Sequence, residues 1–232
     1  MNLIFDIETV GYDLDELSES QQEYLLRYAE KEKDEIQKEE KRDEAIRYLS
    51  LYPWTAKIVS IGFLNTDTEK SLILYEGEAE EEIEEFVPEE KNVIYKAMPE
   101  QEMISSFWKY VSAAETVISF NGRNFDIPFV MIRSAINKMK PPKNLIKNRY
   151  NCREHIDLLE QFTFYGMNRK FNMDFYCNAL QIESPKSKGI SGMEVKELYN
   201  AGRIKDIAVY CGEDVRATFE LYKFWNEFLN IS

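Results

Sequence analysis

Two acids inside an apolar run near the start of the chain restrict the fold more than any other feature. Residues 3–9 read Leu-Ile-Phe-Asp-Ile-Glu-Thr, which places Asp6 and Glu8 two positions apart. Alternate residues of a β-strand point to the same face, so we expect these carboxylates to lie side by side on a buried strand. Two neighbouring buried anions are costly unless a cation lies between them, and oxygen ligands favour Mg²⁺ or Mn²⁺. The run therefore predicts a metal site on a strand, although one such pair is a weak signal by itself.

Length and composition favour one cytoplasmic domain. The chain has 232 residues and is 44% hydrophobic, enough for one well-packed core. Its three cysteines form no Cys-x-x-Cys pair, which indicates a reducing compartment and argues against a zinc site or a disulfide framework. No apolar stretch approaches the roughly 20 residues of a membrane span, and no basic leader precedes the first strand. We expect a single domain over residues 1–232, in the cytoplasm, with no membrane partner.

The charge distribution leaves the question of a nucleic-acid partner open. The net charge of −13 argues against such a partner. One tract, residues 133–153, contains no acid and carries the basic residues Arg133, Lys138, Lys140, Lys143, Lys147, Arg149 and Arg153. An acidic protein with one basic tract can still bind a phosphate backbone locally, but a solvated lysine-rich loop explains the pattern equally well.

Residues 13–49 are strongly charged and contain neither glycine nor proline. Their apolar residues form a thin helical stripe, and residues 30–35 have the mixed-sign charges of an exposed helix. We expect one long helix or a helical hairpin that projects from the core. The functional interpretation is a lid or a surface for a protein partner. Such a composition more often marks a solvated insertion.

The rest of the chain alternates between strand and helix patterns. We expect strands at 57–64, 71–75, 116–120 and 154–158, a possible short extra strand at 92–95, and helices at 99–113, 126–139, 172–180, 193–201 and 203–229. Residues 78–90 read as an acidic loop and residues 184–189 as a polar loop. Together with residues 3–9, the pattern predicts an α/β fold. It has a mixed five-stranded sheet, three strands in a meander, and helices on both faces.

Two further segments place acids where chemistry is common. Asp126 lies where a strand passes into a helix, at the sheet edge that binds ligands in open α/β folds. The alternative is an aspartate that only caps the helix. Tyr210 and Asp214 are four residues apart and share one face of a predicted helix. That face continues an apolar stripe and would bury the aspartate. The alternative is an aspartate on the exposed side of the helix.

Taken together, three segments resemble the three motifs of the DEDD 3′–5′ exonucleases. They are residues 5–9 (Phe-Asp-Ile-Glu-Thr), 120–126 (Phe-Asn-Gly-Arg-Asn-Phe-Asp) and 210–214 (Tyr-Cys-Gly-Glu-Asp), in the family's order. The tyrosine of the third segment resembles the subclass that uses Tyr in place of His. The chain is similar to the proofreading exonuclease domain of family-B DNA polymerases and to stand-alone relatives of it. The resemblance implies a ribonuclease H-like fold.

The resemblance also implies a two-metal site. Asp6, Glu8, Asp126 and Asp214 would hold two divalent cations, Mg²⁺ or Mn²⁺, that activate a water and stabilise the leaving 3′-oxygen. Tyr210 would orient the attacking water or take its proton, and orientation is favoured because an ordinary tyrosine pKa near 10 makes it a poor base. The products would be nucleoside 5′-monophosphates.

Contacts to the substrate are implied for four further residues: Asn121, Phe125, Ile7 and Thr9. Asn121 would donate or accept a hydrogen bond at the 3′ end, and Phe125 would stack on a base or wedge beside it. Core packing is an equally good explanation of Phe125. His155 and Asp157 resemble a segment that the relatives carry near the fifth strand. For Asp157 a purely structural role is favoured over a role in supporting the side chains of the site.

The implied substrate is the 3′ end of a single-stranded nucleic acid. The residues leave DNA and RNA open, and the resemblance favours DNA. Two other functions compete with this one. A hydrolase of short oligonucleotides or nucleotides would suit the acidic surface. A nucleic-acid-binding subunit with a quiet active site would use residues 13–49 to dock on a partner.

Overall fold

A single mixed sheet organises the computed structural model, which describes residues 1–78, 92–147, 149–184 and 194–231. The six strands of these residues run in the order β4-β3-β2-β1-β5-β6. They are β1 (Asn2–Gly11), β2 (Ala56–Asn65), β3 (Ser71–Glu76), β4 (Val93–Met98), β5 (Thr116–Ser119) and β6 (His155–Asp157). β1, β2 and β3 form the predicted antiparallel meander, whereas β4, β5 and β6 each run parallel to a neighbour. The predicted α/β fold class is confirmed.

The sheet has one strand more than the five that the sequence predicts. β4 was expected only as a possible short strand at 92–95, but it pairs with β3 along its whole length. Its residues alternate, so that Tyr95 and Ala97 are buried while Ile94 and Lys96 are exposed. Burial of one face against α8 makes the segment a strand despite its lysine. The acidic loop predicted at 78–90 lies outside the described residues apart from Glu78, and the polar loop at 184–189 lies outside them apart from Ser184.

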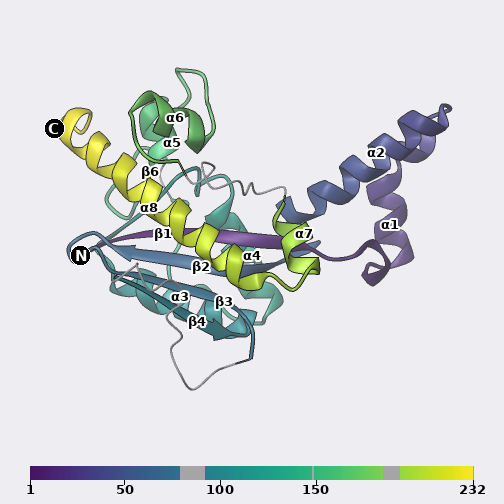
Figure 1. Ribbon diagram of the computed structural model, residues 1–232, viewed down its shortest axis with the longest axis horizontal. Coiled ribbons are helices and arrows are strands. Elements are labelled where there is room, and N and C mark those ends of the chain that lie inside the picture. Colours follow the sequence, from purple (N-terminus) through teal and green to yellow (C-terminus); the bar gives the residue numbers. More distant parts are fainter. Residues whose placement is uncertain (79–91, 148, 185–193, 232) are drawn as a thin grey trace.

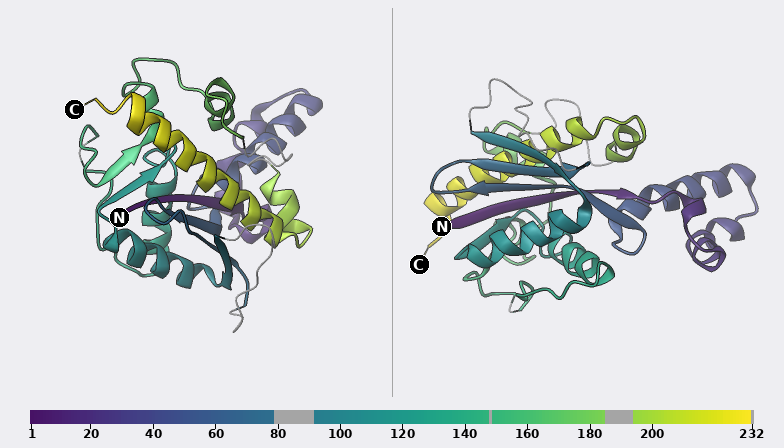
Figure 2. Two further views of the ribbon diagram at one scale, coloured as in Figure 1. Left: turned by 60° about the vertical axis from the view of Figure 1, so that its left-hand side comes forward. Right: turned by 90° about the horizontal axis from the view of Figure 1, so that it is seen from below.

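Helices cover both faces of the sheet (Figures 1 and 2). One face carries α3 (Glu100–Ala113) and α4 (Asp126–Ile136), and the other carries α5 (Leu158–Phe162), α6 (Met173–Ala179), α7 (Val195–Asn200) and α8 (Ile204–Phe228). Among the described residues, no helix is both long enough and apolar enough to cross a membrane.

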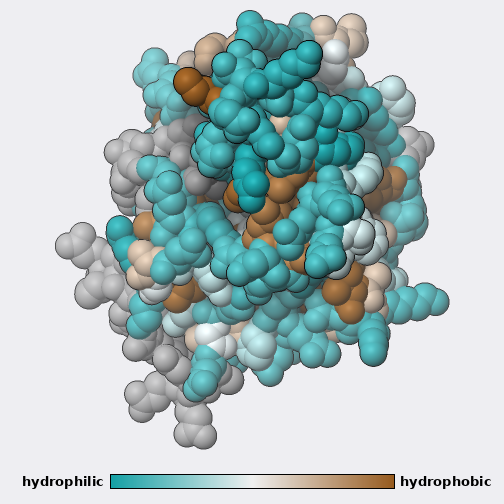
Figure 3. Space-filling model, turned by 90° about the vertical axis from the view of Figure 1, so that its right-hand side faces the viewer, coloured by the Kyte–Doolittle hydropathy of each residue, from teal (hydrophilic) through white to brown (hydrophobic). Residues whose placement is uncertain are grey.

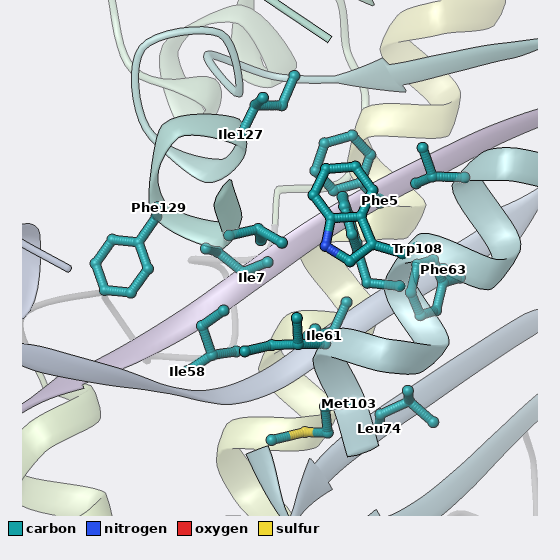
Figure 4. Packing of buried hydrophobic residues seen from close by; sticks show 14 of the residues in the cluster. Phe5, Ile7, Ile58, Ile61, Phe63, Leu74, Met103, Trp108, Ile127 and Phe129 are labelled. Carbon is teal, nitrogen blue, oxygen red and sulfur yellow. The ribbon is translucent and has the colours of Figure 1, made fainter. Parts of the chain in front are cut away.

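The largest cluster of buried side chains lies between the sheet and α3 and α4 (Figure 4). Phe5 of β1 meets Phe107 of α3 edge to face, with ring centroids 5.1 Å apart. Trp108 buries its ring in the same cluster and donates its indole N–H to Ser134 Oγ at 2.8 Å. Each such aromatic ring contributes about 1.5–3 kcal/mol through removal of apolar surface from water. This cluster fixes β1, and with it the acids that β1 carries.

The charged segment 13–49 forms a helical hairpin that projects from one end of the sheet (Figure 1). It contains η1 (Leu14–Glu16), α1 (Glu19–Leu26), η2 (Ala29–Lys31) and α2 (Glu35–Arg47), and η3 (Tyr48–Leu51) leads back to β2. Viewed from the end where this hairpin projects, the surface is mostly hydrophilic, with hydrophobic residues gathered in a hollow near the middle of the face (Figure 3). The predicted helical insertion is confirmed, and the description of the chain as one domain stays a prediction.

The root of this arm is fixed against the end of β1. Leu49 is buried there, and a Cβ at Gly11 would lie 2.8 Å from the Leu49 Cβ, so this close approach requires glycine. Thr9 donates its hydroxyl to the carbonyl oxygen of Ser50 at 2.7 Å. The base of the arm therefore lies directly after the acidic pair of β1.

Candidate active site

β1 presents its two acids toward α8, between apolar neighbours on the same face. The alternate residues Ile4 and Val10 pack into the clusters on the α8 side of the sheet, and Asp6 and Glu8 lie between them. Asp6 is opposite Gly62 of β2, and the register shifts directly after Glu8. Such a bulge redirects a strand locally, and it lies here where the acids end.

A glycine in β2 allows α8 to come close to these acids. A Cβ at Gly62 would lie 2.6 Å from Cγ2 of Val215 and 3.1 Å from Sγ of Cys211, both on α8. The Cys211 thiol in turn donates to the carbonyl oxygen of Asp6 at 3.8 Å. Gly62 is a functional position that was not predicted from the sequence, although a lone glycine inside a strand pattern often marks such an approach.

Three carboxylates from the two ends of the chain meet at this contact. Asp6, Glu8 and Asp214 each offer one oxygen, and these oxygens lie within 4.8 Å of one another. Burial raises the pKa values of Asp6 and Glu8 well above their usual range, and the neighbouring acids raise them further. None of the ion pairs among the described residues includes Asp6 or Glu8.

This donor set fits a hard divalent cation. It consists of carboxylate oxygens only, which suit Mg²⁺ and Mn²⁺. The buried anions repel one another, and a bound cation would remove that repulsion.

Asp126 lies against β1 from the first turn of α4. Its Oδ1 accepts the backbone N–H of Ile7, the residue between the two acids of β1, at 3.2 Å. Burial raises the pKa of Asp126 to about 7, with smaller contributions from the negative charges of Asp157 and Asp214, while the hydrogen bond from Ile7 opposes the shift. Asp126 is not one of the three acids grouped within 4.8 Å. Its negative charge nevertheless contributes to the raised pKa values of Asp6 and Glu8.

Asp157 fixes the loop that carries the second motif. Its carboxylate accepts the backbone N–H groups of Asn121 at 3.1 Å and Arg123 at 2.9 Å. The same carboxylate caps α5 by accepting the N–H groups of Leu159 and Glu160. Asn121 adopts a φ of 64°, a left-handed conformation that asparagine tolerates better than most residues. These bonds support the structural interpretation of Asp157.

His155 is also structural. Its Nε2 lies 2.8 Å from Ser119 Oγ, inside the sheet. Burial lowers the pKa of His155 to about 3, and the charge of Arg123 contributes to the shift. The imidazole is therefore neutral across the physiological pH range.

Tyr210 lies one helical turn before Asp214 and is almost completely buried. Burial raises the pKa of its phenol well above the usual value, helped by the charge of Asp214 and by a hydrogen bond to the Asp214 side chain. A phenol that keeps its proton donates a hydrogen bond and does not act as a base.

The predicted substrate contacts have different surroundings. The Ile7 side chain is buried in the cluster under α3 and α4, on the face opposite the acids, and the Thr9 hydroxyl is bonded to Ser50. Phe125 is half-buried and packs against Phe129, with ring centroids 5.5 Å apart. The buried Ile7 side chain is therefore not available to a substrate.

Part of the basic tract 133–153 is occupied by ion pairs. Arg133 is buried and pairs with Glu100 at 2.6 Å, and Arg149 pairs with Glu160 at 2.7 Å. Lys147 lies 3.4 Å from Glu154. The tract is therefore not a uniform phosphate-binding surface.

Comparison with known families matches this architecture. A family model described as a predicted 3′–5′ exonuclease related to the exonuclease domain of PolB matches residues 53–228. The chain belongs to this family. The matched region contains Asp126, Tyr210 and Asp214 and begins after Asp6 and Glu8.

Individual relatives are DNA polymerases that are much longer than this chain. It is 24% identical to DNA polymerase 1 of Sulfurisphaera ohwakuensis over 183 residues, which are 73% of this chain and 20% of that protein. The structure of the family B DNA polymerase from the hyperthermophilic archaeon Pyrobaculum calidifontis matches with a TM-score of 0.59 and 17% identity. That match covers 98% of this chain and 25% of the polymerase chain. The chain thus spans about a fifth to a quarter of these relatives.

Proposed function

We propose that this protein is a metal-dependent exonuclease that removes nucleotides from the 3′ end of single-stranded nucleic acid, with DNA as the favoured substrate. The observation that carries the proposal is the meeting of Asp6, Glu8 and Asp214 within 4.8 Å, in a chain whose family is that of PolB-like exonucleases. Carboxylates brought together from distant segments of the chain form a site for divalent ions.

In this proposal Asp6, Glu8, Asp126 and Asp214 hold two divalent cations, Mg²⁺ or Mn²⁺. Bound ions would supply a nucleophile at neutral pH and neutralise charge on the phosphoryl group as the bond breaks. Tyr210 orients the attacking water through its hydroxyl oxygen, while its proton is directed to Asp214. Its burial and its raised pKa favour this role over proton abstraction.

The substrate contacts follow from the loop held by Asp157. Asn121 would bind the terminal sugar or base by hydrogen bonds, and the open face of Phe125 would stack on the last base. Ile7 would contribute its backbone, and Thr9 would shape the end of the site. The products would be nucleoside 5′-monophosphates. The cytoplasmic location and a partner for the arm at residues 13–49 stay predictions.

Digestion of 5′-labelled single-stranded DNA and RNA tests the proposal. With Mn²⁺ or Mg²⁺ we expect wild type to give a ladder that shortens from the 3′ end, and we expect EDTA to abolish it. Asp6→Ala should give no ladder, whereas Asp43→Ala, on the exposed surface of α2, should match wild type.

Other outcomes would replace the proposal. Cleavage of dinucleotides but not of longer strands would identify a hydrolase of short oligonucleotides. Binding of the strands without cleavage by folded wild-type protein would identify a subunit with a quiet site. A ladder that persists in Asp6→Ala would refute the assigned site.

A further inference from the structure

Aromatic and basic side chains form a surface beside the proposed site. We define it as the aromatic–basic face, made of Arg169, Lys170, Phe171 and Phe175 at the start of α6. The rings of Phe171 and Phe175 are stacked, with centroids 4.0 Å apart and planes 10° apart. The Arg169 guanidinium lies 5.1 Å from the Phe171 centroid. Phe175 is nevertheless 50% exposed, so part of this stack remains open to solvent.

Ring contacts connect this face to the second motif. The ring centroid of Tyr176 lies 6.2 Å from that of Phe171 and 5.8 Å from that of Phe120. Phe120 directly precedes Asn121. Cys177 of α6 is buried in the same cluster as Val215, the neighbour of Asp214. The face is therefore only a few side chains away from two of the proposed catalytic segments.

Its charge is opposite to that of the protein as a whole. The net charge is −13, yet residues 161–173 contain no acid. The acid before this segment, Glu160, is buried and bound by Arg149 at 2.7 Å and by Arg123 at 3.6 Å. The acid after it, Asp174, accepts the Ser184 hydroxyl at 2.6 Å. The exposed charges of the segment, Arg169 and Lys170, are both cations.

We propose that the aromatic–basic face binds the single strand on the 5′ side of the nucleotide being removed. A base would stack on the open side of Phe175, and Arg169 and Lys170 would contact the adjoining phosphates. Exposed rings beside cations suit a single strand, because every unpaired base offers a face and every nucleotide a negative charge. This inference rests on the proposed exonuclease function and extends it to a second binding position.

Binding measurements test the inference directly. Fluorescence anisotropy would follow 5′-labelled DNA and RNA of about 12 nucleotides in EDTA, where a metal-dependent nuclease does not cut. We expect Phe175→Ala to weaken binding by about 5- to 150-fold, the range for losing one base–aromatic stack. Phe228→Ala is the matched control, since Phe228 is 57% exposed and pairs with Phe224 at 4.9 Å on the far end of α8.

A second variant addresses the charge. Arg169→Ala should reduce the slope of log K against log salt by about 0.7, the value for one phosphate contact with a single strand. Both variants change exposed side chains, and thermal unfolding would verify that they fold.

Cleavage assays separate failure of this inference from failure of the proposed function. The p-nitrophenyl ester of a nucleoside 5′-monophosphate has no nucleotide on the 5′ side of the cleaved bond, so wild type and Phe175→Ala should cleave it equally, while KM for the longer strand rises in the variant. Equal binding of the longer strand by wild type, Phe175→Ala and Phe228→Ala would overturn the inference and leave the exonuclease intact. If folded wild type neither binds nor cleaves any strand, the proposed function itself has failed, and this inference with it.

Discussion

Replacing Asp126 with asparagine should stabilise the metal-free protein while impairing the enzyme. Asp126 is buried, and its pKa is raised from 3.8 to about 7. The folded state therefore binds the proton more tightly than the unfolded state, and this group's contribution to stability is lost as the pH rises toward 7. Three pKa units correspond to about 4 kcal/mol at about pH 8, where the folded carboxylate is ionised.

Asparagine carries no charge at any pH, and its amide oxygen can still accept the N–H of Ile7. The start of α4 favours an anion by only about 0.5 kcal/mol, so relief of the buried charge outweighs that loss. We expect Asp126→Asn to raise the free energy of unfolding by up to about 4 kcal/mol at about pH 8. The gain should fall below about 2 kcal/mol at about pH 5.

Urea unfolding in EDTA at the two pH values measures this difference. Asp43→Asn, on the exposed surface of α2, is the control and should change stability by less than about 0.5 kcal/mol. With Mn²⁺ present the advantage of the variant should shrink, because ions at 100 times their Kd add about 2.7 kcal/mol to wild type and less to a variant that lacks a ligand. A variant that is less stable than wild type in EDTA, or a gain that does not depend on pH, would refute the reasoning.

Three further changes give separate tests of the site. Gly62→Ala should destabilise the protein by about 1–3 kcal/mol in urea unfolding, because the added Cβ would lie 2.6 Å from Cγ2 of Val215. The double variant with Val215→Ala should recover part of that loss. Asp157→Ala should cost about 3 kcal/mol in the same assay, since it leaves four backbone N–H groups without their acceptor, and full stability would argue against its structural role. Tyr210→Phe should lower the rate of 3′ cleavage by about 100-fold without weakening Mn²⁺ binding, and an unchanged rate would exclude the orienting role.

The sequence predicted the class of fold well because most of its strands are short apolar, β-rich runs separated by turns or helical patterns. The run at residues 3–9 has large apolar residues on one face and two acids on the other, and both faces of β1 are arranged accordingly. β4 was underestimated because its exposed positions carry Ile94 and Lys96, which hide the buried alternation of Tyr95 and Ala97. Its strand character comes from packing against α8, which a local pattern does not contain.

The sequence singled out the acids of the candidate site but not the residues that support them. Spacing alone grouped Asp6 with Glu8, and the resemblance added Asp126 and Asp214. The close approach of α8 depends on the absence of a side chain at Gly62. This role could not be predicted, because the local sequence does not show which helix crosses β2. The sequence places Arg133 in a basic tract, but the residue is buried against Glu100 from another helix, a long-range pairing that a run of charges does not reveal.

A count of bound Mn²⁺ tests the central claim most directly. Electron paramagnetic resonance of unbound Mn²⁺, titrated into wild type and into Asp6→Ala, Asp214→Ala and Asp43→Ala, would give the number of ions that each protein holds. We predict two ions for wild type and for Asp43→Ala, and at least one ion fewer for Asp6→Ala and Asp214→Ala. Wild type that binds no Mn²⁺, or equal binding by all four proteins, would contradict the account.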